Sequence, residues 1–218
     1  MIFLPFSIIL ILLFILFLPV FFFLIQIEII RLALSKIGLS PAGAFIIILL
    51  SFIGSAINIP IHTREALVIP PQSSLPLSRL FLGMPYENTR QVIAINLGGC
   101  VIPLLLCVYL LPKAPLLPTF FATIITTIVC FRLSTVTPGM GVHIPALIPP
   151  LIAVGLAFLL SPGNKIPVAY ISGVLGVIIG ADILNLPHLG QYPGIMSIGG
   201  AGVYDGIFLV GVISALLA

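Results

Sequence analysis

Two aspartates in the last quarter of the chain are the residues whose spacing most suggests chemistry. Asp182 lies about one turn before the end of an apolar segment that Pro187 stops, and Asp205 lies about one turn into the next apolar segment. Segments joined by a short turn run antiparallel. At about 1.5 Å of rise per residue, both carboxyl groups then lie roughly 6–8 Å inside the same membrane face. A charge at that depth is costly, and the chain has only five acidic residues.

Two carboxyl groups a few ångströms apart in a low dielectric cannot both ionise, so they share one proton. The ionised group can then activate a water molecule, and the protonated group can donate to a peptide carbonyl oxygen. The pair therefore predicts an intramembrane aspartyl peptidase with Asp182 and Asp205 as catalytic residues. Asn185, Tyr204 and Asn96 are the expected neighbours on the substrate side, and a transmembrane peptide is the expected substrate.

Other interpretations of the same residues stay open. Asn58, Asn96, Asp182, Asn185 and Asp205 together could line a midplane site of an ion or small-solute channel or transporter. A membrane scaffold without chemistry is a further alternative. Asp205 in a first helical turn also suits the positive end of the helix dipole, and a buried hydrogen bond to Asn96 or to a threonine would explain Asp182.

Several other chemistries are disfavoured by the sequence. His62, His143 and His188 are scattered without an HExxH motif, and neither GxSxG nor a phosphate-binding GxxxxGK[ST] loop occurs. Three cysteines without a CxxC pair argue against a disulfide framework or a zinc site. No metal or cofactor is therefore expected. A net charge of +3 without a basic cluster argues against a nucleic-acid partner.

The amino-acid composition indicates that membrane-spanning helices carry the two aspartates. Of 218 residues, 61% are hydrophobic and 6% are charged, and the mean hydropathy is +1.38. Runs of about 20 apolar residues cross the roughly 30 Å of hydrocarbon in a bilayer. We therefore expect a single integral membrane domain, residues 1–218, in the plasma membrane. The expected fold class is an all-α polytopic bundle of about seven (six to seven) transmembrane helices, at about 3–28, 42–57, 92–111, 116–131, 147–160, 166–186 and 201–218.

The proline-rich segment 58–91 is expected to be an extramembrane hairpin or loop, because its five prolines exclude a continuous helix. Lysine and arginine in short loops predict the orientation. Arg31, Lys36, Lys113 and Lys165 fall in loops on one side, which places the N-terminus outside and the C-terminus inside.

Four stretches carry a resemblance to a known family: IAINLGGCVIP at 93–103, PGMGVHIPALIPPLIA at 138–153, IGADILNL at 179–186 and SIGGAGVYDGIFL at 197–209. From residue 58 onward the chain resembles a prokaryotic family of polytopic membrane proteins, domain of unknown function 1614. That resemblance implies a membrane location and no established activity.

A second resemblance is to intramembrane aspartyl proteases of the presenilin and signal-peptide-peptidase kind. Tyr204-Asp205 resembles their Tyr-Asp motif, Gly180-Ala181-Asp182 their Gly-x-Asp core, and Pro145-Ala146-Leu147 their Pro-Ala-Leu motif. The resemblance implies that Pro145, Ala146 and Leu147 lie beside the catalytic pair and contact the substrate. The order of the motifs along this chain differs from theirs.

Overall fold

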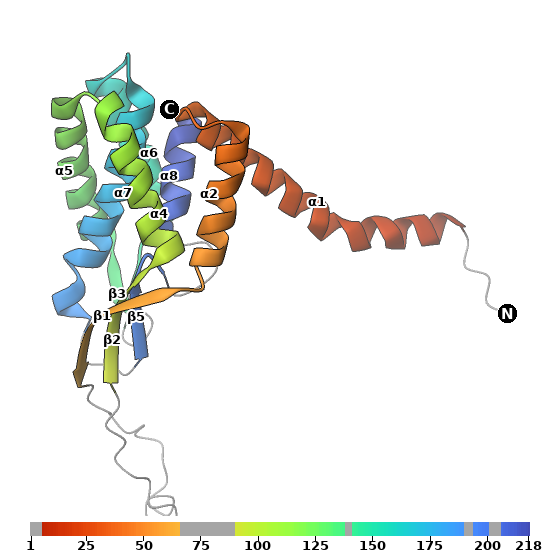
Figure 1. The fold of residues 1–218 in the computed structure, drawn as a ribbon, viewed down its shortest axis with the longest axis horizontal. Coiled ribbons are helices and arrows are strands. Elements are labelled where there is room, and N and C mark those ends of the chain that lie inside the picture. Colours follow the sequence, from red (N-terminus) through yellow and green to blue (C-terminus); the bar gives the residue numbers. More distant parts are fainter. Residues whose placement is uncertain (1–5, 66–89, 138–140, 190–193, 201–205) are drawn as a thin grey trace, which may run out of the picture.

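A computed structural model describes residues 6–65, 90–137, 141–189, 194–200 and 206–218. Helices predominate among them, and Figure 1 shows most of these helices as an upright bundle with a small sheet at one end. The α-helices are α1 (Phe6–Lys36), α2 (Pro41–Gly54), α4 (Ile102–Leu110), α5 (Leu116–Leu133), α6 (Ile148–Leu160), α7 (Lys165–Val177) and α8 (Gly206–Leu217).

Short turns of other helix types interrupt or extend these helices. Two are π-helical, η1 (Leu97–Val101) and η3 (Ile178–Ile183), and two are 3₁₀ turns, η2 (Leu111–Lys113) and η4 (Leu186–His188). The strands are β1 (Asn58–Glu65), β2 (Arg90–Asn96), β3 (Thr135–Thr137), β4 (Gly141–His143) and β5 (Gly194–Ile198).

Three helices are long and apolar enough to cross a membrane: residues 8–36, 116–133 and 165–188, the last of which joins α7, η3 and η4. The other apolar helices are shorter, between 10 and 17 residues. The predicted spans 116–131 and 147–160 agree closely with α5 and α6. The count of six to seven membrane crossings stays a prediction, because four of the helices fall short of the length that a straight crossing requires.

Helix α7 is the centre of the bundle and packs against α4, α5, α6 and α8. Its glycine face explains how closely these helices approach. A Cβ atom on Gly176 would lie 2.5 Å from a Thr126 methyl group, and one on Gly180 would lie 2.4 Å from the Thr127 carbonyl oxygen. Gly173 faces Ser214 of α8 in the same way. The small-residue stripe is therefore a packing surface, because only glycine leaves room for the neighbouring helix.

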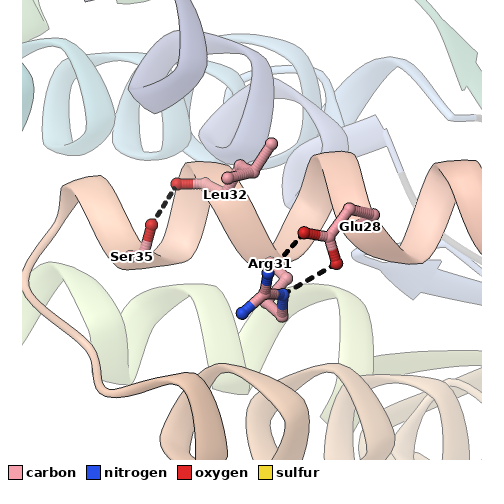
Figure 2. Close-up of polar contacts among 4 residues, drawn as sticks. All are labelled: Glu28, Arg31, Leu32 and Ser35. Atoms are coloured by element: carbon pink, nitrogen blue, oxygen red, sulfur yellow. Dashed lines mark hydrogen bonds and ion pairs between the residues drawn. The ribbon is translucent and has the colours of Figure 1, made fainter.

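Helix α1 extends further than the sequence predicted. It continues to Lys36, although the expected span ends near residue 28, and Pro19 stands inside it. Its last turns pack on the bundle through Ile30, Ala33 and Leu34, whereas its N-terminal part projects away from the bundle with apolar side chains exposed (Figure 1). Glu28 and Arg31 form an ion pair on this helix, three residues apart (Figure 2).

A three-stranded sheet with the order β1-β2-β5 lies at the lower end of the bundle in Figure 1, and the C-terminus lies at the opposite end. The strand β2 corrects the prediction of an all-helical span at 92–111, because residues 90–96 pair antiparallel with β1 and parallel with β5. The expected hairpin at 58–91 is confirmed only in its two ends, since residues 66–89 lie outside the described ranges. Strand β5 was not predicted.

Candidate functional site

The candidate site lies where two parallel strands run from the sheet into the bundle. Strands β2 and β5 are in register, with Ile95 opposite Ile198, and each leads directly into a Gly-Gly pair. Gly199 and Gly200 both have positive φ angles, +86° and +80°, which glycine alone adopts without strain. A Cβ atom on Gly199 would lie 2.6 Å from the Cβ atom of Cys100, so the two junctions are packed against each other.

Asn96 joins the first junction to helix α2. Its side chain is fully buried and accepts a hydrogen bond from the Gly99 amide at 2.7 Å, which caps η1. Its Nδ2 atom donates to the Ser55 carbonyl oxygen at 2.7 Å and to Asn58 Oδ1 at 3.1 Å. A buried amide with all these partners fixes the start of a helix, because unpaired backbone groups there would be costly.

Ser197 extends this polar cluster to β5. Its hydroxyl donates to Asn58 Oδ1 at 2.6 Å, so Asn58 receives hydrogen bonds from both strands that enter the bundle. Asn58 and Asn96, which the sequence placed in a common polar site, are therefore together. Ser197 was not predicted as a site residue. The sequence signal for it is that a Gly-Gly pair follows shortly after Ser197, as another Gly-Gly pair follows shortly after Asn96.

Asp182 approaches the second junction from the other side. It lies in η3, where the helix widens to π-type hydrogen bonding, and its side chain is half-buried. Its Oδ2 atom accepts a hydrogen bond from the Gly199 amide at 3.3 Å. The carboxylate is thus turned toward the connection that leads from β5 into α8. π-Helical turns are rare and are often found at functional sites.

Asn185 was predicted to contact substrate, but its hydrogen bonds have a structural role. Its Nδ2 atom donates to the carbonyl oxygens of Gly180 and Ala181 and to the Ser134 hydroxyl, at 3.1, 2.9 and 2.8 Å. These contacts satisfy the last carbonyls of η3 and tie them to the end of α5. The side chain is buried among them.

The remaining predicted site residues are not brought together with Asp182 by any described contact. Pro145, Ala146 and Leu147 are exposed in the connection before α6, and Leu147 has 62% of its surface exposed. The neighbouring strand β4 does contact η3. Tyr204 and Asp205 lie outside the described residues. The Gly199 amide is one hydrogen-bond partner of Asp182. Thr119, Thr123 and Thr126 donate to carbonyl oxygens of their own helix.

The α7–α8 interface holds two further polar groups, Tyr170 and Ser214. Both side chains are fully buried, and within the described parts of the chain neither hydroxyl has a hydrogen-bond partner. Between this level and Asp182, the interface is apolar, with Val174, Val177 and Ile207 buried. The interface therefore has polar groups near both of its ends and an apolar layer between them.

Comparisons with known proteins identify only the family. No curated protein and no solved structure matches the chain, so the resemblance to intramembrane aspartyl proteases has only its short motifs as support. The family model described as "Protein of unknown function (DUF1614)" matches residues 52–217. Because this match covers well over half of the sequence, the chain belongs to that family.

Proposed function

We propose that the chain is an integral membrane protein that moves an ion, the proton, along the α7–α8 interface. Asp182 is the ionisable group at the sheet end of this path, and Tyr170 and Ser214 are the polar groups nearer the other end. The proposal keeps the seven-helix arrangement, in which the short apolar helices cross the membrane together with the three long ones. Its membrane is the plasma membrane.

The observation that carries the proposal is the distribution of polar groups along the α7–α8 interface. Asp182 and Tyr170 lie on a helix long enough to span a bilayer, and Ser214 lies on α8 beside it. Ionisable residues within membrane segments are costly and commonly mark ion or proton pathways. Asp182 lies beside interrupted helices, η1 and η3, as the binding sites of many transporters do. The buried apolar layer at Val174 and Val177 is suited to act as a gate, since apolar constrictions exclude water.

The test is proton flux into sealed vesicles that contain the purified full chain and an internal pH-sensitive dye. A potassium gradient with an ionophore drives the flux. The wild-type chain is expected to acidify the vesicles at least tenfold faster than protein-free vesicles, and Asp182→Asn is expected to abolish most of that difference. Glu28→Gln is the matched control, because it removes one carboxylate from an exposed ion pair on α1.

Two results would contradict the proton path. One is a wild-type rate equal to that of protein-free vesicles, and the other is an Asp182→Asn rate equal to that of the wild type. A scaffold protein gives the first result.

Proteolysis by Asp182 and Asp205 is a second proposal, and one observation favours it. Among described residues, α7 and α8 pack closely, with Gly173 against Ser214 and Tyr170 against Gly211. The two helices run antiparallel, because Lys165 at the start of α7 shares a pocket with Lys36, which donates to the Leu216 carbonyl oxygen near the end of α8. The end of α7, which η3 with Asp182 continues, therefore lies at the same end of the pair as Gly206, which begins α8 and follows Asp205 in the sequence. A transmembrane peptide added to the sheet edge is the substrate that this proposal requires.

The peptidase proposal has its own assay. Pooled single-span peptides are incubated with the chain in detergent, and products are detected by mass spectrometry. Cleavage by the wild type that is lost in both Asp182→Asn and Asp205→Asn, with retained folding, supports a dyad. Cleavage that persists in either variant contradicts it.

A further inference from the structure

The end of the bundle opposite the sheet has a basic pocket of about 350 Å³. Three lysines line it from three different elements: Lys36 ends α1, Lys113 ends η2, and Lys165 begins α7. In the sequence, these lysines fall in three separate loops that are expected on one side of the membrane. The structure gathers them around one cavity, which we name the lysine pocket.

The lysines are held in place by neutral partners. Lys36 Nζ donates to the Leu216 carbonyl oxygen at 2.5 Å, and Lys113 Nζ donates to the Tyr109 hydroxyl at 2.7 Å. The Tyr109 hydroxyl donates in turn to the Gly38 carbonyl oxygen at 3.1 Å. Lys165 Nζ lies 3.9 Å above the ring of Phe158. An ammonium group has three donors, so each lysine keeps hydrogen-bonding capacity for a ligand.

The charge of the pocket is not balanced by neighbouring carboxylates. In the described part of the chain, the one ion pair joins Glu28 and Arg31, and it includes none of the three lysines. Three positive charges around one cavity repel one another unless an anion binds among them. The pocket is therefore chemically suited to a group with several negatively charged oxygens.

The position of the pocket suggests which anion it binds. Lys36 and Lys165 are terminal residues of two of the three helices that are long enough to span a membrane, so the pocket lies at the depth of lipid headgroups. The wall also includes apolar side chains, Ile37, Leu110 and Ile166. Just below it on α4, Leu105 and Val108 are exposed and apolar. A phosphate above and an acyl chain below would both find suitable contacts.

We propose that the lysine pocket binds the phosphate of an anionic phospholipid. The headgroup phosphate lies among the three ammonium groups, and one acyl chain lies along α4. Basic pockets between membrane helices bind anionic headgroups in this way, and the site is on the side that the lysine-rich loops assign to the cytoplasm. The proposal is independent of Asp182 and of the ion path.

The test measures lipid binding to the purified full chain in a zwitterionic detergent by native mass spectrometry. The probes are phosphatidylglycerol, phosphatidylcholine and inorganic phosphate. We expect one phosphatidylglycerol to bind with at least tenfold preference over phosphatidylcholine. Each lysine near an anionic group contributes on the order of a fivefold change in affinity, so Lys36→Gln combined with Lys113→Gln is expected to weaken binding about 25-fold.

The matched control removes two positive charges at the sheet end, with Arg90→Gln combined with Arg132→Gln, and is expected to leave the affinity unchanged. Lys36→Arg combined with Lys113→Arg keeps the charge and is expected to keep binding, which separates a lost ligand contact from misfolding. The proposal would be overturned if Arg90→Gln combined with Arg132→Gln weakened lipid binding as much as Lys36→Gln combined with Lys113→Gln does. Binding of phosphatidylcholine as tight as that of phosphatidylglycerol would also overturn the proposal. Full competition by millimolar inorganic phosphate would overturn it too, because a soluble anion would then be the ligand.

Discussion

At the scale of single residues, Gly98 makes the tightest approach among the described glycines, and it makes it to α2. A Cβ atom at this position would lie 2.0 Å from the Ser51 carbonyl oxygen and 2.4 Å from the Ser55 amide nitrogen. The Ser51 hydroxyl also donates to the Gly98 carbonyl oxygen at 2.9 Å. The backbone of α2 is rigid here, so an added methyl group has no flexible neighbour to displace.

Gly98→Ala is therefore expected to lower the free energy of unfolding by about 3 kcal/mol, the range for overpacking against a rigid neighbour. The measurement is denaturant unfolding in detergent micelles, followed by circular dichroism. Gly155→Ala on α6 is the control, because a Cβ atom there meets nothing within 4 Å. The control is expected to be neutral or slightly stabilising, since alanine favours helix more than glycine does. Equal stability of the two variants would contradict the described approach of η1 to α2.

Residue types alone found part of the site. Asn58 and Asn96 stood out because amides are unusual in so apolar a chain, and they do meet. The Gly199 amide, which donates to Asp182, could not be found in this way, because any residue other than proline would offer the same group. The structural role of Asn185 depends on carbonyl groups freed by the π-helical turn, which no sequence pattern announced.

At the scale of elements, α1 divides into a part that packs and a part that does not. Leu34 on α1 is fully buried against the bundle, whereas Leu24, on the same helix, has 57% of its surface exposed. Leu34→Ala is expected to cost about 3 kcal/mol of stability, because it leaves a cavity in a packed core. Leu24→Ala is expected to cost less than about 0.5 kcal/mol, as for most exposed positions.

The same unfolding assay compares the two leucine variants. A loss at Leu24 as large as that at Leu34 would mean that the N-terminal part of α1 packs against protein, either this bundle or a second copy.

The sequence predicted helices α5 and α6 closely because each is an apolar run bounded by proline, serine or arginine. The stretch 88–95 could form a short strand or begin the helical span expected at 92–111, and the helical interpretation was wrong for a physical reason. Val92, Ile93 and Ile95 are followed, after Asn96 and a glycine pair, by the apolar run of α4, and hydropathy cannot distinguish a buried strand from a buried helix. Their strand conformation depends on pairing with β5, about a hundred residues further along the chain.

At the scale of the whole molecule, the bundle has two chemically different ends. The lysine pocket lies at one end, and the sheet with Asp182, Asn96 and Ser197 lies at the other. Both proposals for Asp182 require these ends to face opposite sides of a membrane. If they do, the positions of the lysines predict that the sheet end faces the outside of the cell.

Labelling of single cysteines in intact cells with a membrane-impermeant maleimide tests this arrangement most directly. Thr135→Cys reports the sheet end and Gly163→Cys the lysine end, both at exposed positions, while the natural cysteines are buried. We expect Thr135→Cys to be labelled in intact cells and Gly163→Cys to be labelled only after the membrane is opened. Labelling of both from the same side would show that the helices between them do not cross the membrane, and it would contradict the account.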